Sequence, residues 1–492
     1  MTVLSFHGFS DFFVFLTSLL VGISMIMGVN AVNSAPSFML NYFHYINRDE
    51  NAVPVHPSFW TNVLTFYTVT TQVTQTLVEP INLTIFLQRF SLLFRLEAST
   101  VLMLVELLMV VIMPHTCRSE TGAMVGLIVA GIVGGVGRGY FENTCYALFG
   151  PFPPKYLAGV MVGVPMSGAI VSILQIILLA AMDDSYGSIL SVSIIYFTVS
   201  IGIIFISGVC IILLLLNTFA RRYVAEFRSE HSAWMNIYRN VNEEPRMLEA
   251  IRAAGYPHPD NIEDASAVKG AMNVDEGAAG AEVMGEVRVH NEPTAKEKGL
   301  TDDTESEKGE AEEPQTVASA TSAEMLQVVK LWPIVKKIWT MMVACFMTFS
   351  VTCLMYPGVM LAVSPADNWY TTLVMATYNF GDLFGRLLSM WRRLWPSRNV
   401  IFIGSLARVI FIPLLVLCAK HVIPSQAAAF VFAALMGITT GFIGTLSMVY
   451  SAETPGLLSD AERASAGQLT GVCLLVGCSV GSLLQLAIVL VL

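Results

Sequence analysis

The chain alternates between long apolar blocks and short polar connections, and most blocks approach the roughly 20 residues that a helix needs to cross a bilayer. Small residues recur at every fourth position in several blocks, a spacing that lets membrane helices approach closely. The pattern predicts an all-α polytopic membrane protein with eleven transmembrane helices. The expected spans are residues 11–33, 60–84, 97–115, 122–150, 156–182, 189–217, 338–363, 369–391, 399–419, 427–450 and 467–491.

A hydrophilic stretch separates six of these spans from the other five. It is rich in Glu, Ala, Gly, Lys and Ser and almost free of aromatic residues in its middle, so it cannot bury a core. We therefore expect an N-terminal six-helix bundle at residues 1–217, a cytoplasmic and largely disordered loop at 218–336, and a C-terminal five-helix bundle at 337–492.

Composition agrees with a membrane protein. Apolar residues make up 54% of the chain and charged residues only 13%, whereas a soluble domain carries about 25% charged residues. The net charge of −10 gathers largely in the hydrophilic stretch, and no basic tract suggests a nucleic-acid partner. The eight Cys are scattered without paired spacing, so neither a metal site nor a cofactor is expected.

Basic residues near the span ends predict the orientation, because cytoplasmic connections are enriched in Lys and Arg. The bias places the N-terminus and the long loop in the cytoplasm and the C-terminus outside, in a multi-pass protein of the plasma membrane. The sequon Asn82-Leu83-Thr84 then lies at an inner end and should be unused. The inner connections carry Arg89, Arg95, Lys155, Arg392, Arg393, Arg398 and Arg463, and the outer ones Arg48, Arg118 and Lys420.

The eighth expected span carries an acid and a base. Asp382 and Arg386 are four residues apart and share a helix face, although a charge at the bilayer centre costs roughly 2.5–3.5 kcal/mol. Asn379 lies on the same face. Amide, carboxylate and guanidinium together suit a small ligand with a hydrogen-bonding edge, such as a base or a sugar. A structural ion pair that locks two helices is the alternative.

The fourth expected span contains a second polar group, Arg138, Glu142 and Asn143. Arg138 and Glu142 are again four apart, so they either neutralise each other within the helix or line a polar cavity between the halves, where the carboxylate can take a proton. Arg408 in span nine suits an inter-helix brace, and Asn30 adds to the polar residues of span one. Glu106 in span three has no evident role.

Enzyme motifs are lacking. An intramembrane aspartyl protease needs two membrane aspartates, and only Asp382 qualifies. A serine protease of the membrane needs a Ser–His pair, but no His falls in the interior of an expected span. The glycines around Gly137 lack the strand and the Lys-Ser/Thr of a phosphate-binding loop. The sequence therefore argues against an enzyme.

Asn379-Phe380-Gly381-Asp382-Leu383-Phe384-Gly385-Arg386 resembles the N-x-x-D-x-x-G-R motif of the equilibrative nucleoside transporter family. Three further segments resemble that family in the expected order and spacing. They are Pro154-Lys155-Tyr156, Tyr356-Pro357-Gly358-Val359 and Ala407-Arg408-Val409-Ile410-Phe411-Ile412-Pro413. The first span and Tyr140-Phe141-Glu142 are most similar to the kinetoplastid protozoan branch.

The resemblance implies a major-facilitator-like fold in a six-plus-five arrangement, with a nucleoside or nucleobase held between the two halves. It implies substrate contact by Asn379, Asp382 and Arg386, and a base-reading position at about Asn143, with Asn30 of span one as a further candidate. Members of the kinetoplastid branch salvage purines, and several couple uptake to protons.

We therefore predict uptake of purine nucleobases, nucleosides or both by alternating access, with the purine, the lipid bilayer and protons as partners. The candidates for proton coupling or gating are Glu142, Arg138, Asp382 and Arg408. Two alternatives stay open: a nutrient receptor that binds purine without moving it, and a channel on the same scaffold.

Overall fold

The computed structural model describes residues 8–49, 51–82, 90–149, 152–181, 186–224, 227, 331–365, 367–457 and 460–490. All of them fall in one compact unit, Met1–Pro245 together with Ser319–Leu492. Most of the expected hydrophilic loop at 218–336 lies outside the described residues, as do two residues of the sequon at 82–84. The predicted disorder of that loop is therefore untested.

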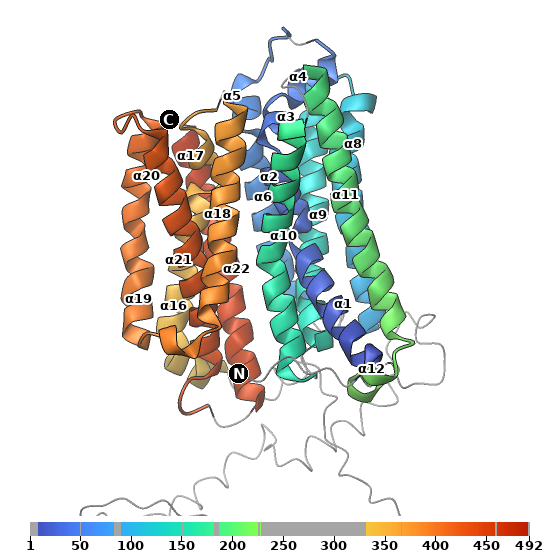
Figure 1. Ribbon diagram of the computed structural model, residues 1–492, viewed down its shortest axis with the longest axis vertical. Coiled ribbons are helices and arrows are strands. Elements are labelled where there is room, and N and C mark those ends of the chain that lie inside the picture. Colours follow the sequence, from blue (N-terminus) through green and yellow to red (C-terminus); the bar gives the residue numbers. More distant parts are fainter. Residues whose placement is uncertain are drawn as a thin grey trace, which may run out of the picture. The chain divides into compact units, whose positions relative to one another are not determined.

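The regular structure is helical and forms two groups, blue to green and yellow to red in Figure 1. The N-terminal group comprises α1 (Phe9–Met25), α2 (Met27–Asn33), α3 (Pro36–Leu40), α4 (Tyr42–Asn47), α5 (Pro57–Thr61), α6 (Val63–Asn82), α8 (Leu92–Thr116), α9 (Glu120–Phe149), α10 (Pro154–Ala181), α11 (Tyr186–Leu214) and α12 (Thr218–Tyr223). The C-terminal group comprises α16 (Leu331–Met355), α17 (Gly358–Leu361), α18 (Asn368–Ser389), α19 (Arg398–Ala407), α20 (Phe411–Ala419), α21 (Gln426–Ala452) and α22 (Asp460–Val489).

Eight of the described helical segments are long and apolar enough to cross a membrane, or nine if α1 and α2, bent by 46° at Ile26, count as one span. The remaining expected spans, 60–84 and 369–391, coincide with α6 of 20 residues and α18 of 22 residues. Both helices are too polar to qualify on composition. The count of eleven thus stays a prediction, and its two doubtful members are the helices richest in polar side chains.

Close glycine contacts bring α18 against α21. A Cβ added at Gly385 would collide with the backbone carbonyl of Ile438, and one at Gly441 with that of Asp382. Gly22 and Gly163 bring α1 and α10 together in the same manner. The prediction from the four-residue spacing is confirmed at these helix pairs, where small residues let the backbones touch.

We expect Gly441→Val to lower the free energy of unfolding by about 1–3 kcal/mol, because its side chain would have to push α21 off the α18 backbone. Thermal unfolding of the purified protein measures this change. Gly467→Val on α22 is the matched control, since a Cβ at Gly467 meets nothing within 4 Å. Equal destabilisation by the two substitutions would contradict the packing assignment.

The two groups of helices meet along two seams. In one seam α10 and the short α3 pack on α18, and in the other α6 packs on α22. The two most polar long helices, α6 and α18, therefore belong to opposite groups, and each takes part in a seam. Each of them places a polar side chain in bonds to the other half, Thr76 from α6 and Asn379 from α18.

Candidate functional site

Asp382 and Arg386 form an ion pair within α18. Arg386 Nε donates to Asp382 Oδ2 at 3.2 Å and to Oδ1 at 3.4 Å, and the two side chains are 13% and 20% exposed, the acid less than the base. Neither makes an ion pair with another helix among the described residues. The ion pair itself therefore lies within one helix and does not join two helices directly.

Asn379 instead joins the two halves. Its Nδ2 donates to Ser172 Oγ of α10 at 2.8 Å and, over a longer 3.4 Å, to Ser34 Oγ at the end of α2. Gly168 of α10 makes room for this approach, since a Cβ there would lie 3.0 Å from Asn379. In this arrangement the Asn379 amide nitrogen bonds to the N-terminal half. It lies about one helical turn from the charged pair.

Two carboxylates of the N-terminal half are held by amides. Glu142 of α9 accepts from Gln75 Nε2 at 2.9 Å and from the Tyr146 hydroxyl at 3.2 Å. Glu79 of α6 accepts from Asn143 Nδ2 at 3.1 Å. Asn143, the expected base-reading residue, thus positions an acid that sequence reasoning overlooked. The available signal was the spacing of Gln75 and Glu79, four apart on the most polar expected span of its half.

Arg138 does not pair with Glu142. Its guanidinium lies 3.8 Å from Glu106 Oε1 of α8, its Nε donates to the Gly134 carbonyl at 3.2 Å, and Glu106 also accepts a hydrogen bond from Tyr67 of α6. Arg138 and Glu106 are 1% and 0% exposed. The structure thus gives a place to Glu106, and it excludes an ion pair between Arg138 and Glu142 within α9 in this arrangement.

Gly134 and Gly28 make room for the Glu106 carboxylate. A Cβ at Gly28 would lie 2.6 Å from Glu106 Oε2, and one at Gly134 would overlap the carboxyl group. The acid therefore sits in a pocket that only glycine backbones can form, with α2, α8 and α9 around it.

Arg408 and Asn30 make bonds inside their own halves. Arg408, at the break between α19 and α20, donates to the Thr348 carbonyl at 2.7 Å and to the hydroxyls of Thr352 and Thr440 at 2.9 and 2.6 Å. It thus bridges α16 and α21, as a brace would. Asn30 Nδ2 donates to Ser167 Oγ at 2.6 Å and joins α2 to α10.

Glu142 of the N-terminal half feels the positive charge of the α18 pair in the C-terminal half. Glu142 lies close enough to Arg386 and to Arg138 for both cations to attract it. Arg386, which pairs with Asp382, is thus the cation of the C-terminal half that acts on Glu142, while Glu79 is linked to the neighbouring Asn143 by a hydrogen bond.

The second seam, between α6 and α22, is made of hydroxyl groups. Thr76 donates to the Leu475 carbonyl at 2.9 Å, Ser479 donates to the Gln72 carbonyl at 2.9 Å, and the two hydroxyl oxygens lie 2.6 Å apart. Together with the Asn379 bonds, the described hydrogen bonds between the halves all join uncharged groups.

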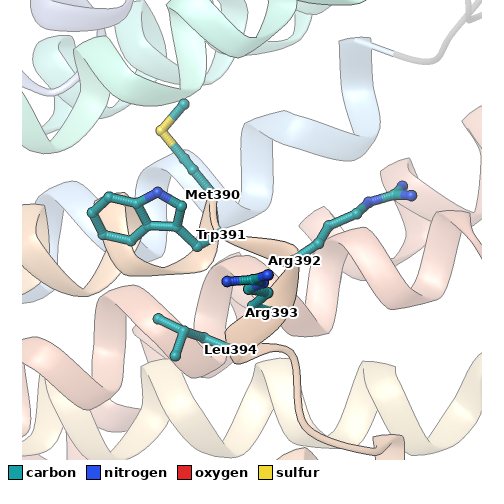
Figure 2. A pocket seen from close by; sticks show the side chains of 5 residues that line it. All are labelled: Met390, Trp391, Arg392, Arg393 and Leu394. Carbon is teal, nitrogen blue, oxygen red and sulfur yellow. The ribbon is translucent and has the colours of Figure 1, made fainter. Parts of the chain in front are cut away.

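A separate depression of about 610 Å³ lies at the end of α18 and is lined by five consecutive residues. Figure 2 shows their side chains fanning out from the turn, among them Trp391 and the two arginines. Arg392 pairs with Glu453 at 3.1 Å on an exposed surface. No candidate site residue lines this depression, so its size does not make it the ligand site. The lining residues are Met390, Trp391, Arg392, Arg393 and Leu394.

Comparison with known proteins places these observations in a family context. A family model described as "Nucleoside transporter" matches residues 128–263 and 279–490. Nucleoside transporter 1.2 of Leishmania donovani is 33% identical over 97% of this chain and 93% of its own length. Adenosine transporter 1 of Crithidia fasciculata is 31% identical over 97% and 93%. Equilibrative nucleoside transporter 4 of Homo sapiens is 23% identical over 69% and 60%.

Among solved structures, a crystal structure of a D-xylose–proton symporter superposes with a TM-score of 0.56 at 10% identity, covering 96% of this chain and 90% of that one. A structure of the major facilitator proton:xylose symporter XylE, bound to a halogenated glucose, gives 0.53 at 11% identity over 96% and 87%. At such identities the likeness concerns the fold alone, and it confirms the expected major-facilitator-like architecture.

Proposed function

Because the chain belongs to the nucleoside transporter family, we propose that it carries purine nucleosides and nucleobases across the membrane by alternating access, with the substrate held between its two halves. The protein is a multi-pass membrane transporter of nucleosides and not an enzyme. The preference for purines is supported by the adenosine named for one relative. The place of the substrate is supported by the polar groups between the halves.

The observation that carries the proposal is the Asp382–Arg386 pair on α18, whose Arg386 also attracts Glu142 of the other half. A purine offers both N–H donors and ring-nitrogen acceptors, which a carboxylate and a guanidinium can recognise together. The Asp382–Arg386 bonds of 3.2 and 3.4 Å are long for a charged pair, so a substrate can replace them at small cost.

We assign supporting roles to the amides. Asn379 holds Ser172 while the halves are in contact and turns to the substrate when that seam opens. Asn143 reads the base once its bond to Glu79 is released, and Asn30 fixes α2 beside the site through Ser167. Arg138 and Arg408 brace their own halves, so we propose that they gate the motion from within rather than touch substrate.

We further propose that uptake is coupled to protons, with Glu142 or Asp382 as the acceptor. Each is a carboxylate inside a helix of the membrane region, and each has a cation close by that can stabilise its ionised form. The plasma membrane, with the N-terminus and long loop inside and the C-terminus outside, is the proposed location. Figure 1 supports an odd number of crossings, because α1 begins and α22 ends at opposite ends of the helices.

Uptake in cells that lack purine transport tests the proposed function. We expect labelled adenosine, inosine, hypoxanthine or adenine to accumulate faster than in empty cells, and faster at acidic than at neutral external pH. Saturable binding without uptake would instead indicate a receptor. A flux that unlabelled purine on the far side does not accelerate would indicate a channel.

A further inference from the structure

Glu79 forms a reciprocal arrangement with Glu142. Gln75 lies one turn before Glu79 on α6 and donates to Glu142, while Asn143 follows Glu142 on α9 and donates to Glu79. Each helix thus supplies one acid and one amide, and each amide holds the acid of the other helix. The two carboxylates lie close enough for their negative charges to repel each other.

Within the part of the chain that the structure describes, this pair of acids has no direct cationic partner. Neither carboxylate makes an ion pair with any Lys or Arg of the described residues. Glu79 Oε2 is buried and has no hydrogen-bond partner, which leaves an oxygen placed to carry a proton. Two neighbouring carboxylates in a medium of low dielectric constant do not both stay ionised, because the second group would have to ionise against the negative charge of the first.

The surroundings favour one bound proton rather than none or two. Arg138 of α9 and Arg386 of α18 both attract Glu142, so that acid is the better one to keep ionised. No cation among the described residues acts comparably on Glu79, which is the better one to hold the proton. The charged and titratable groups that act on the pair are Arg138, Cys145 and Tyr146 of α9, Arg386 of α18 and Cys478 of α22.

We propose that Glu79 and Glu142 share a single proton and form the site at which substrate movement is linked to proton movement. This inference rests on the proposed purine transport. A proton from water on one side of the membrane binds the dyad and forms an O–H bond on Glu79. When substrate releases Arg386 from Asp382, the guanidinium moves toward Glu142, stabilises the doubly ionised dyad, and the proton leaves to water on the other side.

A purely structural role for the dyad makes a different prediction. If the four hydrogen-bonding groups only hold α6 against α9, then Glu79→Gln keeps that contact, because an amide oxygen still accepts from Asn143. Neither substrate exchange nor proton flux should then change. If the dyad carries a proton, the same variant keeps the contact but removes the titrating group.

The test uses the purified full chain in liposomes that contain a pH-sensitive dye. An inward adenosine gradient should acidify the lumen with the wild type. With Glu79→Gln, exchange of labelled for unlabelled adenosine should stay within about two-fold of the wild type, while acidification per adenosine falls at least ten-fold. Glu453→Gln, a carboxylate that is 48% exposed and paired at the surface with Arg392, is the matched control and should behave as the wild type.

The outcomes separate the dyad from the transport activity. Wild-type protein that moves no adenosine refutes the proposed function itself. Wild-type protein that moves adenosine without acidification overturns proton coupling and the dyad together, and leaves the transport activity standing. Glu79→Gln protein that acidifies normally overturns the dyad alone. If Glu79→Gln inserts poorly, Glu79→Asp is the second variant, and it must restore acidification per adenosine because it returns a carboxylate to α6.

Discussion

Asp382→Ala should reduce the initial rate of purine uptake at least ten-fold at an unchanged amount of protein on the cell surface. The substitution removes a group that we place against the substrate and leaves the mostly buried Arg386 without its partner. A hydrogen bond to a charged group contributes about 1.5–3 kcal/mol, which corresponds to roughly a ten- to hundred-fold loss. Uptake of labelled adenosine, normalised to surface-labelled protein, measures the effect.

Asp367→Ala is the matched control, because it removes a carboxylate from the other end of the same helix. Asp367 caps α18 by accepting from the Tyr370 amide at 3.0 Å, so its loss should cost about 0.5–2 kcal/mol of stability without a specific loss of uptake per folded carrier. The exchanged variant Asp382→Arg with Arg386→Asp tests the structural alternative. Recovery of uptake by the exchange would mean that the pair serves the fold and not the substrate.

Arg138→Met should destabilise the protein by about 3–5 kcal/mol, because it leaves Glu106 as a buried acid without a cation. The double variant Arg138→Met with Glu106→Gln should regain most of that loss, since replacing both members of a buried pair is often nearly neutral. The thermal midpoint of the purified protein, for the two single variants and the double variant, gives the coupling energy of the pair.

The control for this cycle is Tyr67→Phe, which removes only the hydroxyl that donates to Glu106. It should cost about 1–3 kcal/mol, the penalty of one unsatisfied buried group. Strictly additive losses for Arg138 and Glu106 would contradict the assignment of the pair. They would show instead that each residue interacts independently with its surroundings.

Much of the fold follows from the apolar blocks, because membrane helices satisfy their own backbone and need only length and apolarity. The apolar pattern does not predict where a membrane helix is interrupted. The expected span 11–33 bends at Ile26, and the expected span 399–419 is interrupted at Arg408, where a short 3₁₀ turn lies between α19 and α20. Neither Ile26 nor Arg408 is a proline or a glycine, so the local sequence does not mark either break.

The candidate site also depends on contacts between helices that the sequence alone does not predict. A spacing of four residues predicts a shared face, and it correctly anticipates that Asp382 meets Arg386. The same spacing suggests that Arg138 could meet Glu142, yet the nearest carboxylate to Arg138 belongs to Glu106 on α8. Intrahelical spacing cannot weigh a partner on another helix. For the same reason the sequence does not single out Glu79, whose partner Asn143 lies on another helix, α9.

The uncharged seams have a consequence for the speed of the carrier. Thr76, Ser479 and Asn379 hold the halves together through groups for which water is an equally good partner. Each such bond contributes only about 0.5–1.5 kcal/mol net, so rocking apart replaces protein partners by water without stranding a charge. Turnover should therefore be nearly independent of ionic strength, and hydration of the opening seam, rather than rupture of ion pairs, should govern how often the carrier changes the side it faces.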